Sequence, residues 1–164
     1  MAQAEAVPRR KILVAVDEGD ESLYALSWCL TNLVSHHSKD TLILLYVKSP
    51  PAVYSAMDGT GYLFSSEIVA AMERYNQQVS DSVMEKAERL CAGFDQVVVE
   101  KRVESGDARD VICQTTQKLG VDLLVMGSHG YGMIKRAFLG SVSNHCAQNV
   151  KCPVMIVKRP KSTT

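Results

Sequence analysis

The amino-acid sequence predicts an α/β fold: a single doubly wound parallel sheet of five strands with helices on both faces. Five short apolar runs have the composition of strands that are buried on both sides. They alternate with four segments in which apolar residues recur every three or four positions, as in helices that pack on a core. This strict alternation favours parallel strands joined by right-handed crossovers.

The elements follow one another along the chain. The predicted strands span residues 11–17, 41–47, 96–103, 122–127 and 153–157. The predicted helices span residues 21–35 and 66–91, then a segment containing Val111 to Leu119, and last a short one containing Val142 to Val150. Asp20 or Ser22 is expected to cap the first helix, and Asp107 the third.

Residues 48–64 contain two prolines and two glycines and show no periodicity. A loop of this length inside a compact domain is more often functional than incidental, and it could form a lid. Nothing in the composition marks a second domain. We therefore expect one domain over residues 11–159, with flexible ends at 1–10 and 160–164.

Composition limits the classes of partner. The 164 residues carry 18 basic and 18 acidic side chains, so no overall charge attracts nucleic acid or an anionic membrane. No segment approaches the ~20 apolar residues of a membrane span, and the first ten residues hold no apolar signal run. We expect a cytoplasmic protein without a nucleic-acid or membrane partner.

Cysteines give little indication of function. Cys29, Cys91, Cys113, Cys146 and Cys152 are scattered and form no CxxC pair. Reduced, mostly buried thiols are the usual outcome of such a pattern. No histidine stands at zinc-finger spacing from Cys146 and Cys152, so no metal site is predicted.

Glycines gather after the fourth predicted strand, in the stretch GSHGYGMIKRAFLGSVS. Gly127, Gly130 and Gly132 permit a tight turn lined by backbone amides, and Gly140 and Ser141 stand where the next helix begins. A helix start offers unpaired N–H groups and a partial positive charge, which suit a phosphate. Ordinary turns, with Ser141 as a simple N-cap, are the alternative interpretation.

Two familiar nucleotide motifs are absent. A P-loop needs Lys-Ser or Lys-Thr after its last glycine, whereas Gly132 is followed by Met133 and Ile134. A dinucleotide fingerprint would follow the first strand, but residues 17–22 read DEGDES, whose acids would repel a pyrophosphate. The first turn is therefore predicted to be a poor phosphate site.

The spacing G-x2-G-x9-G-[ST], met by Gly127, Gly130, Gly140 and Ser141, resembles the ATP-binding signature of the universal stress protein family. The resemblance extends over about residues 9–159. It implies a Rossmann-like sheet in the order 3-2-1-4-5, with the nucleotide across the ends of strands one and four. It also implies a homodimer through the apolar edge strand, Pro153 to Val157.

Carried over position by position, the resemblance implies that Asp17 contacts ribose or adenine. Asp17 could instead be a turn or cap residue, and His129 could contact phosphate, orient a water molecule or lie solvated in its loop. No catalytic residue and no metal ligand is predicted. The predicted nucleotide-binding residues are Ala15, Val16, Asp17, Val47, Met126, Gly127, His129, Gly130, Gly140, Ser141, Val142 and Ser143.

Three hypotheses for function remain open. The first is an ATP-binding regulatory protein of the stress response, with AMP or ADP as alternative ligands and Mg²⁺ accompanying the triphosphate. The second is a slow Mg²⁺-dependent ATPase, in which Asp17 holds the metal and His129 positions water. The third is a redox-sensitive, chaperone-like oligomer that uses its cysteines.

Overall fold

The structure is a computed structural model and describes residues 9–34, 39–49, 66–130 and 139–160. The predicted lid at 48–64, both predicted flexible ends and Gly132 fall wholly or mostly outside these residues. Nine elements alternate along the described part of the chain: β1 (Lys11–Val16), α1 (Asp20–Asn32), β2 (Thr41–Lys48), α2 (Ser66–Cys91), β3 (Val98–Ser105), α3 (Ala108–Leu119), β4 (Leu123–Gly127), α4 (Ser141–Asn149) and β5 (Val154–Val157).

All five strands are parallel and lie in the order β3-β2-β1-β4-β5. Both the predicted fold class and the strand order implied by the family resemblance are therefore confirmed. The first three strands extend the sheet in one direction, and the chain then returns to place β4 on the other side of β1. The point between β1 and β4 is the topological switch point, where open α/β sheets bind their ligands.

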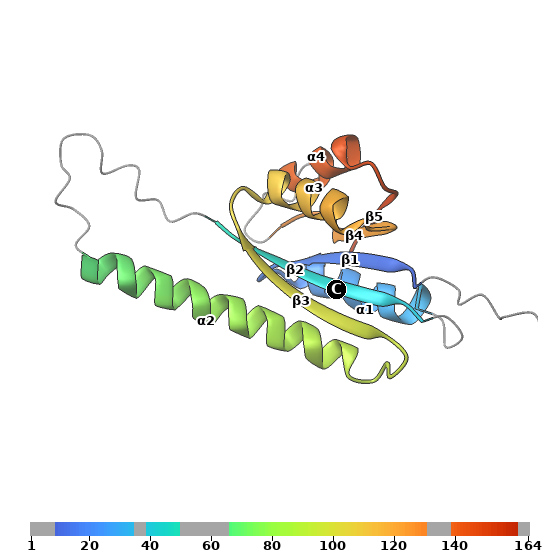
Figure 1. The fold of residues 1–164 in the computed structure, drawn as a ribbon, viewed down its shortest axis with the longest axis horizontal. Coiled ribbons are helices and arrows are strands. Elements are labelled where there is room, and N and C mark those ends of the chain that lie inside the picture. Colours follow the sequence, from blue (N-terminus) through green and yellow to red (C-terminus); the bar gives the residue numbers. More distant parts are fainter. Residues whose placement is uncertain (1–8, 35–38, 50–65, 131–138, 161–164) are drawn as a thin grey trace, which may run out of the picture.

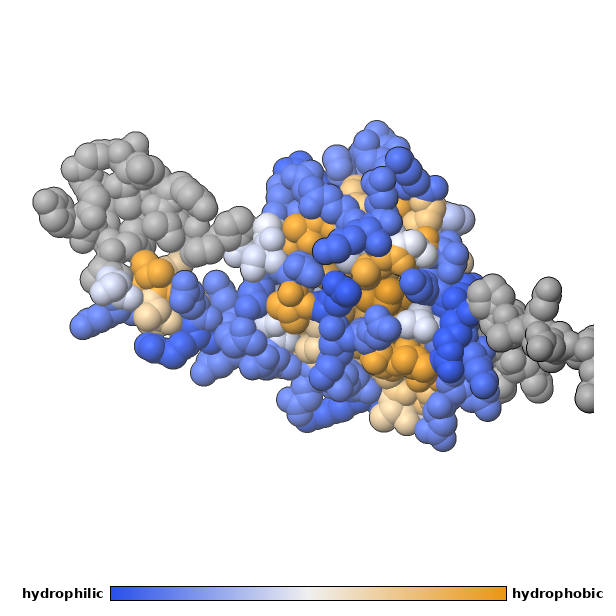
Figure 2. All heavy atoms as spheres, viewed as in Figure 1, coloured by the Kyte–Doolittle hydropathy of each residue, from blue (hydrophilic) through white to orange (hydrophobic). Residues whose placement is uncertain are grey.

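Two helix layers cover the sheet (Figure 1). Helices α1 and α2 enclose one buried cluster, to which α1 contributes Leu26 and Leu30 and α2 contributes Val83 and Met84. Helices α3 and α4 enclose a second cluster with Ile112 and Cys146. Figure 2 shows hydrophobic residues between the two layers, whereas the helices present mostly hydrophilic ones. Among the described residues, no helix is long and apolar enough to cross a membrane.

Strand burial follows position in the sheet. The first six residues of β2 are all buried, because β2 lies between two other strands and under both helix layers. At the edge, no residue of β3 is buried: five of its eight residues are exposed and three are partly buried. Its start lies at Val98, two residues later than predicted, because residues 95 and 96 form a turn after α2.

Helix starts were predicted only in part. Asp107 caps α3 as expected, and its carboxylate accepts a hydrogen bond from the Arg109 amide. The predicted caps of α1 are wrong, because Gly19 is the N-cap and Asp20 is the first helical residue. Ser22 is instead used to close the turn that precedes α1.

The sheet opens at its carboxyl edge. Pairing between β1 and β4 ends at Val14 and Val125, two residues before either strand ends. Beyond that level, among the described residues, β1 pairs only with β2, and β4 only with β5. The two central strands thus separate and leave a crevice at the switch point.

Candidate functional site

A pocket fills this crevice on the side of α3 and α4. Ten of the twelve predicted nucleotide-binding residues line it, and the other two, Gly140 and Ser141, lie at the start of α4 beside it. Four lining residues were not predicted. Among the described residues, the lining consists of Ala15, Val16, Asp17, Ser22, Leu45, Val47, Ala108, Ile112, Met126, Gly127, His129, Gly130, Val142 and Ser143.

One side of the pocket is apolar. Leu45 and Val47 are two residues apart on β2, so both side chains face α3, and Met126 faces the same way from β4. Ala15 lies between them, and its small side chain leaves space above the sheet. The Val16 side chain belongs to the opposite cluster, so Val16 borders the pocket with its backbone.

Gly127 is required by a close approach of α1. A Cβ atom at this position would stand 3.0 Å from the Glu21 carbonyl carbon and 3.1 Å from its oxygen. Backbone atoms of a packed helix cannot move aside as a flexible side chain can. Among the described residues only Gly106 and Gly120 have positive φ, so Gly127, Gly130 and Gly140 are not there for left-handed turns.

Glu21 of α1 stabilises the turn that follows β4 by hydrogen bonds. Its Oε2 atom accepts hydrogen bonds from Ser128 Oγ at 3.0 Å and from the His129 amide at 2.8 Å. The same oxygen lies 3.4 Å from His129 Nδ1. Glu21 and His129 are 12% and 10% exposed, so the histidine is packed and not solvated.

Ser128, His129 and Glu21 do not form a catalytic triad. In a triad the histidine uses one ring nitrogen for the nucleophile and the other for the acid. Here the same Nδ1 atom faces both Ser128 Oγ, at 3.1 Å, and Glu21. The arrangement fixes the shape of the turn and is not that of a charge-relay nucleophile.

The start of α4 packs on this turn. Gly140 is the N-cap, so the interpretation of Ser141 as the cap is wrong, and Ser141 is the exposed first residue of the helix. The Gly140 amide donates to the Ser128 carbonyl at 2.7 Å. Buried Ser143 donates to the same carbonyl at 2.7 Å and to the Gly140 carbonyl at 3.1 Å. Glycine brings no side chain to occupy the first amides of α4.

Asp17 closes the turn after β1. Its Oδ1 atom accepts from the Gly19 amide at 2.8 Å and from Ser22 Oγ at 3.1 Å, while the Asp17 amide donates to Ser22 Oγ at 3.0 Å. The turn role considered for Asp17 is therefore present, and Asp17 also lines the pocket. Next to it, Glu18 accepts a 2.6 Å hydrogen bond from Tyr46, and burial, followed by this bond, raises the pKa of Tyr46.

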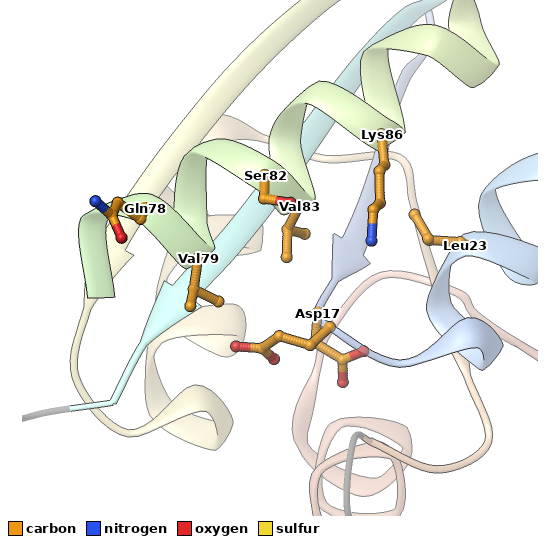
Figure 3. A pocket seen from close by; sticks show the side chains of 8 residues that line it. Asp17, Leu23, Gln78, Val79, Ser82, Val83 and Lys86 are labelled. Atoms are coloured by element: carbon orange, nitrogen blue, oxygen red, sulfur yellow. The ribbon is translucent and has the colours of Figure 1, made fainter. Parts of the chain in front are cut away.

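A second hollow lies on the other side of this turn, between α1 and α2 (Figure 3). Lys86 extends from α2 toward the turn that carries Asp17, and Leu23 of α1 stands beside it. Asp17 borders both hollows. Over the residues that the structure describes, no group of three or more histidine, cysteine or acidic side chains is placed to hold a metal ion.

Sheet order, helix layers and a crevice at the switch point define a doubly wound α/β protein of the type that binds small ligands at this edge. Residues 8–158 match the universal stress protein family. The match covers nearly the whole chain, so the protein belongs to the universal stress protein family. The family resemblance drawn from the sequence is thereby confirmed.

Relatives and solved structures agree with this assignment. Universal stress protein PHOS34 of Arabidopsis thaliana is 30% identical over 93% of this chain, which spans only 63% of the length of PHOS34. A solved Arabidopsis thaliana member of the family, with AMP bound, is 27% identical, with 93% of each chain covered and a TM-score of 0.68. UspA from Lactobacillus plantarum, 17% identical, has the same fold, with a TM-score of 0.73 over 93% of this chain and 99% of its own.

Proposed function

We propose that the protein binds an adenine nucleotide at the carboxyl edge of its sheet and acts as a nucleotide-responsive regulatory protein of the stress response. One observation carries the proposal: residues from β1, β2, β4 and α4 that the family resemblance implied as nucleotide contacts line a single pocket. The family member solved with AMP bound gives independent support for this class of ligand.

The pocket offers a different surface to each part of a nucleotide. The apolar surface of Leu45, Val47, Ile112 and Met126 suits the faces of a purine ring. The Asp17 carboxylate is an acceptor for ribose hydroxyls. The amides of Gly130 and of the first turn of α4, at the positive end of that helix, suit phosphate oxygens.

Isothermal titration with AMP, ADP and ATP, each with and without Mg²⁺, tests the proposal. A pair of variants on α4 makes it specific. Val142→Phe fills the pocket from its wall, whereas Ala147→Phe adds the same ring to the exposed face of the same helix. We expect saturable binding that weakens about tenfold or more in Val142→Phe only.

Absence of binding by the native protein would overturn the proposal, and so would equal weakening in both variants. The titrations with and without Mg²⁺ distinguish ATP from AMP and ADP as the ligand. If binding requires the metal, the triphosphate is favoured as the physiological ligand. Product analysis of the same samples tests slow hydrolysis directly.

We also propose that the protein is a cytoplasmic homodimer. The five cysteines are all free, as is usual in a reducing compartment. Strand β5 is at the sheet edge, paired on one side by β4, and carries the apolar sequence VMIV. The β5 strand of a second copy of the chain could pair with the hydrogen-bonding groups on its other edge. Light scattering that gives a monomer at micromolar concentration would refute the dimer.

A further inference from the structure

Helix packing brings the cysteines, scattered in the sequence, into two groups on opposite faces of the sheet. Cys29 of α1 and Cys91 of α2 belong to the cluster under α1 and α2. Cys146 of α4 belongs to the other cluster, and Cys113 of α3 and Cys152 pack against it. All five thiols are free.

The two groups differ in their access to solvent. Cys29 and Cys91 are 0% and 5% exposed, and burial raises the pKa of their thiols to about 12 and about 11. Cys113 is partly exposed and lines a surface pocket formed by the ends of α3 and α4, together with Cys152. A dissolved oxidant can therefore meet Cys113, whereas Cys29 and Cys91 are shielded.

Cys113 has a second thiol within reach. Helices α3 and α4 pack side by side, and Cys113 packs against the buried cluster that contains Cys146. The Cys113 thiol also contributes, after burial, to the raised pKa of Cys146. Cys146 is fully buried, and burial raises the pKa of its thiol to about 12. Cys146 is thus protected from direct attack but stands where it can react with a modified Cys113.

We propose that Cys113 and Cys146 form a reversible intramolecular disulfide when the protein meets hydrogen peroxide. The Cys113 sulfur attacks the peroxide and becomes a sulfenic acid, releasing one water molecule. The Cys146 sulfur then attacks the Cys113 sulfur, and the hydroxyl leaves as a second water with the Cys146 proton. Two thiols are oxidised to one disulfide, and one peroxide is reduced to two waters.

The disulfide would reshape the candidate site, a consequence that rests on the proposed function. Ile112 and Val142 line the pocket, one residue before Cys113 and one helical turn before Cys146. A disulfide bond of about 2.05 Å is far shorter than a contact between two thiols, so α3 and α4 must move together. This movement narrows the pocket, and nucleotide affinity falls.

Intact mass spectrometry of the native protein after a short peroxide treatment tests the bond itself. We expect a loss of about 2 Da that dithiothreitol reverses, with peptide mapping that joins the peptides of Cys113 and Cys146. In Cys146→Ala, the product at Cys113 should be a sulfenic acid that dimedone traps. Cys152→Ser is the matched control, since it removes the other cysteine of the same surface pocket, and it should still form the bond.

Mapping on the native protein does not depend on how well a variant folds. A disulfide that includes Cys152, or oxidation that begins at Cys29 or Cys91, would overturn the assignment. A native protein that keeps its mass under peroxide would do the same.

Titration with AMP tests the consequence for the site. We expect AMP to bind the oxidised native protein at least threefold more weakly than the reduced one, with no such difference in Cys113→Ser. Equal affinity in both states of the native protein would overturn the coupling. Failure of the reduced protein to bind AMP would instead refute the proposed function, and the mass measurement would still decide the disulfide.

Discussion

The turns that follow β1 and β4 stand side by side at the carboxyl edge of the sheet, yet they are stabilised in opposite ways. The first, residues 17–22, is closed by its own side chains, with Asp17 and Ser22 bonded to each other and to the local backbone. The second, residues 127–130, is held from outside by Glu21, Gly140 and Ser143. Because other segments stabilise the second turn, the side of it that faces the pocket stays available for a ligand.

The acids of the first turn show how the two regions depend on each other. From the sequence, DEGDES is a poor phosphate site because of its negative charge. In the structure Glu18 accepts from Tyr46, and Glu21 accepts from Ser128 and His129. Glu21 is not among the residues that line the described pocket. One of the four acids, Glu21, is therefore used to build the frame of the neighbouring turn.

Gly127→Ala should have the largest effect, because it breaks the contact between the two turns. Its methyl group would stand 3.0 Å from the Glu21 backbone, and either α1 or the end of β4 must move. We expect a loss of about 3 kcal/mol in the free energy of unfolding, at the upper end of overpacking in cores. Denaturation by urea, followed by circular dichroism, measures it.

Gly93→Ala is the matched control, since a Cβ atom at Gly93 meets nothing within 4 Å. A change of about 0.5 kcal/mol or less is expected there. Equal losses in the two variants would show that the close approach of α1 is not what requires glycine at position 127.

Gly127 also shows where prediction from sequence succeeds and fails. Alternation of apolar runs places β4, and the glycine motif places the site at its end, because both signals are local. The physical reason for a glycine at position 127 differs from the predicted one. It is the close approach of the α1 backbone at Glu21, which stands more than one hundred positions earlier in the chain. No pattern around Gly127 carries that information.

Glu21→Ala should have the next largest effect. The substitution removes the carboxylate oxygen that accepts from both Ser128 Oγ and the His129 amide, in a region that is nearly closed to solvent. We expect the unfolding free energy to fall by about 2 kcal/mol, as is usual when buried donors lose a charged partner. Nucleotide affinity should fall as well, because the turn that carries Gly130 is released.

Asp20→Ala provides the comparison within the same helical turn. Its carboxylate is 79% exposed and meets Arg159 at 3.4 Å, so its loss should cost about 0.5 kcal/mol or less. If the two variants unfold alike, the role assigned to the Glu21 hydrogen bonds is wrong.

Four pocket residues, Ser22, Leu45, Ala108 and Ile112, were missed for a related reason. Each fits an ordinary place in its element: a cap, a strand interior or a helix face. One signal could have found Ala108. Every helix that follows a strand in this fold begins at the same edge of the sheet, so the first turn of α3 must lie close to the site. Glu21 offered no such signal, since an acid in the first turn of a helix is common.

Ser143→Ala tests the support that α4 gives to the second turn. The Ser143 hydroxyl is buried and donates to the carbonyls of Ser128 and Gly140. After its removal, the Ser128 carbonyl still accepts the hydrogen bond from the Gly140 amide. We expect thermal or urea unfolding to report a loss of about 1 kcal/mol. Ser141→Ala, two residues earlier and exposed, should leave stability nearly unchanged, and a loss equal to that of Ser143→Ala would contradict this assignment.

Gly140→Ser should change stability least and the site most selectively. The new Cβ atom would stand 3.3 Å from His129 Cα, a tight contact that destabilises the fold. The hydroxyl would cap α4 and stabilise it. The two effects on the free energy of unfolding should cancel to within about 0.5 kcal/mol. The same hydroxyl would occupy an amide that we propose for phosphate, and AMP affinity should fall by roughly tenfold. Gly140→Ala brings the same Cβ atom without the hydroxyl and should weaken AMP binding much less. Equal weakening would assign the loss to the Cβ contact, and the open helix start would then have no part in binding the nucleotide.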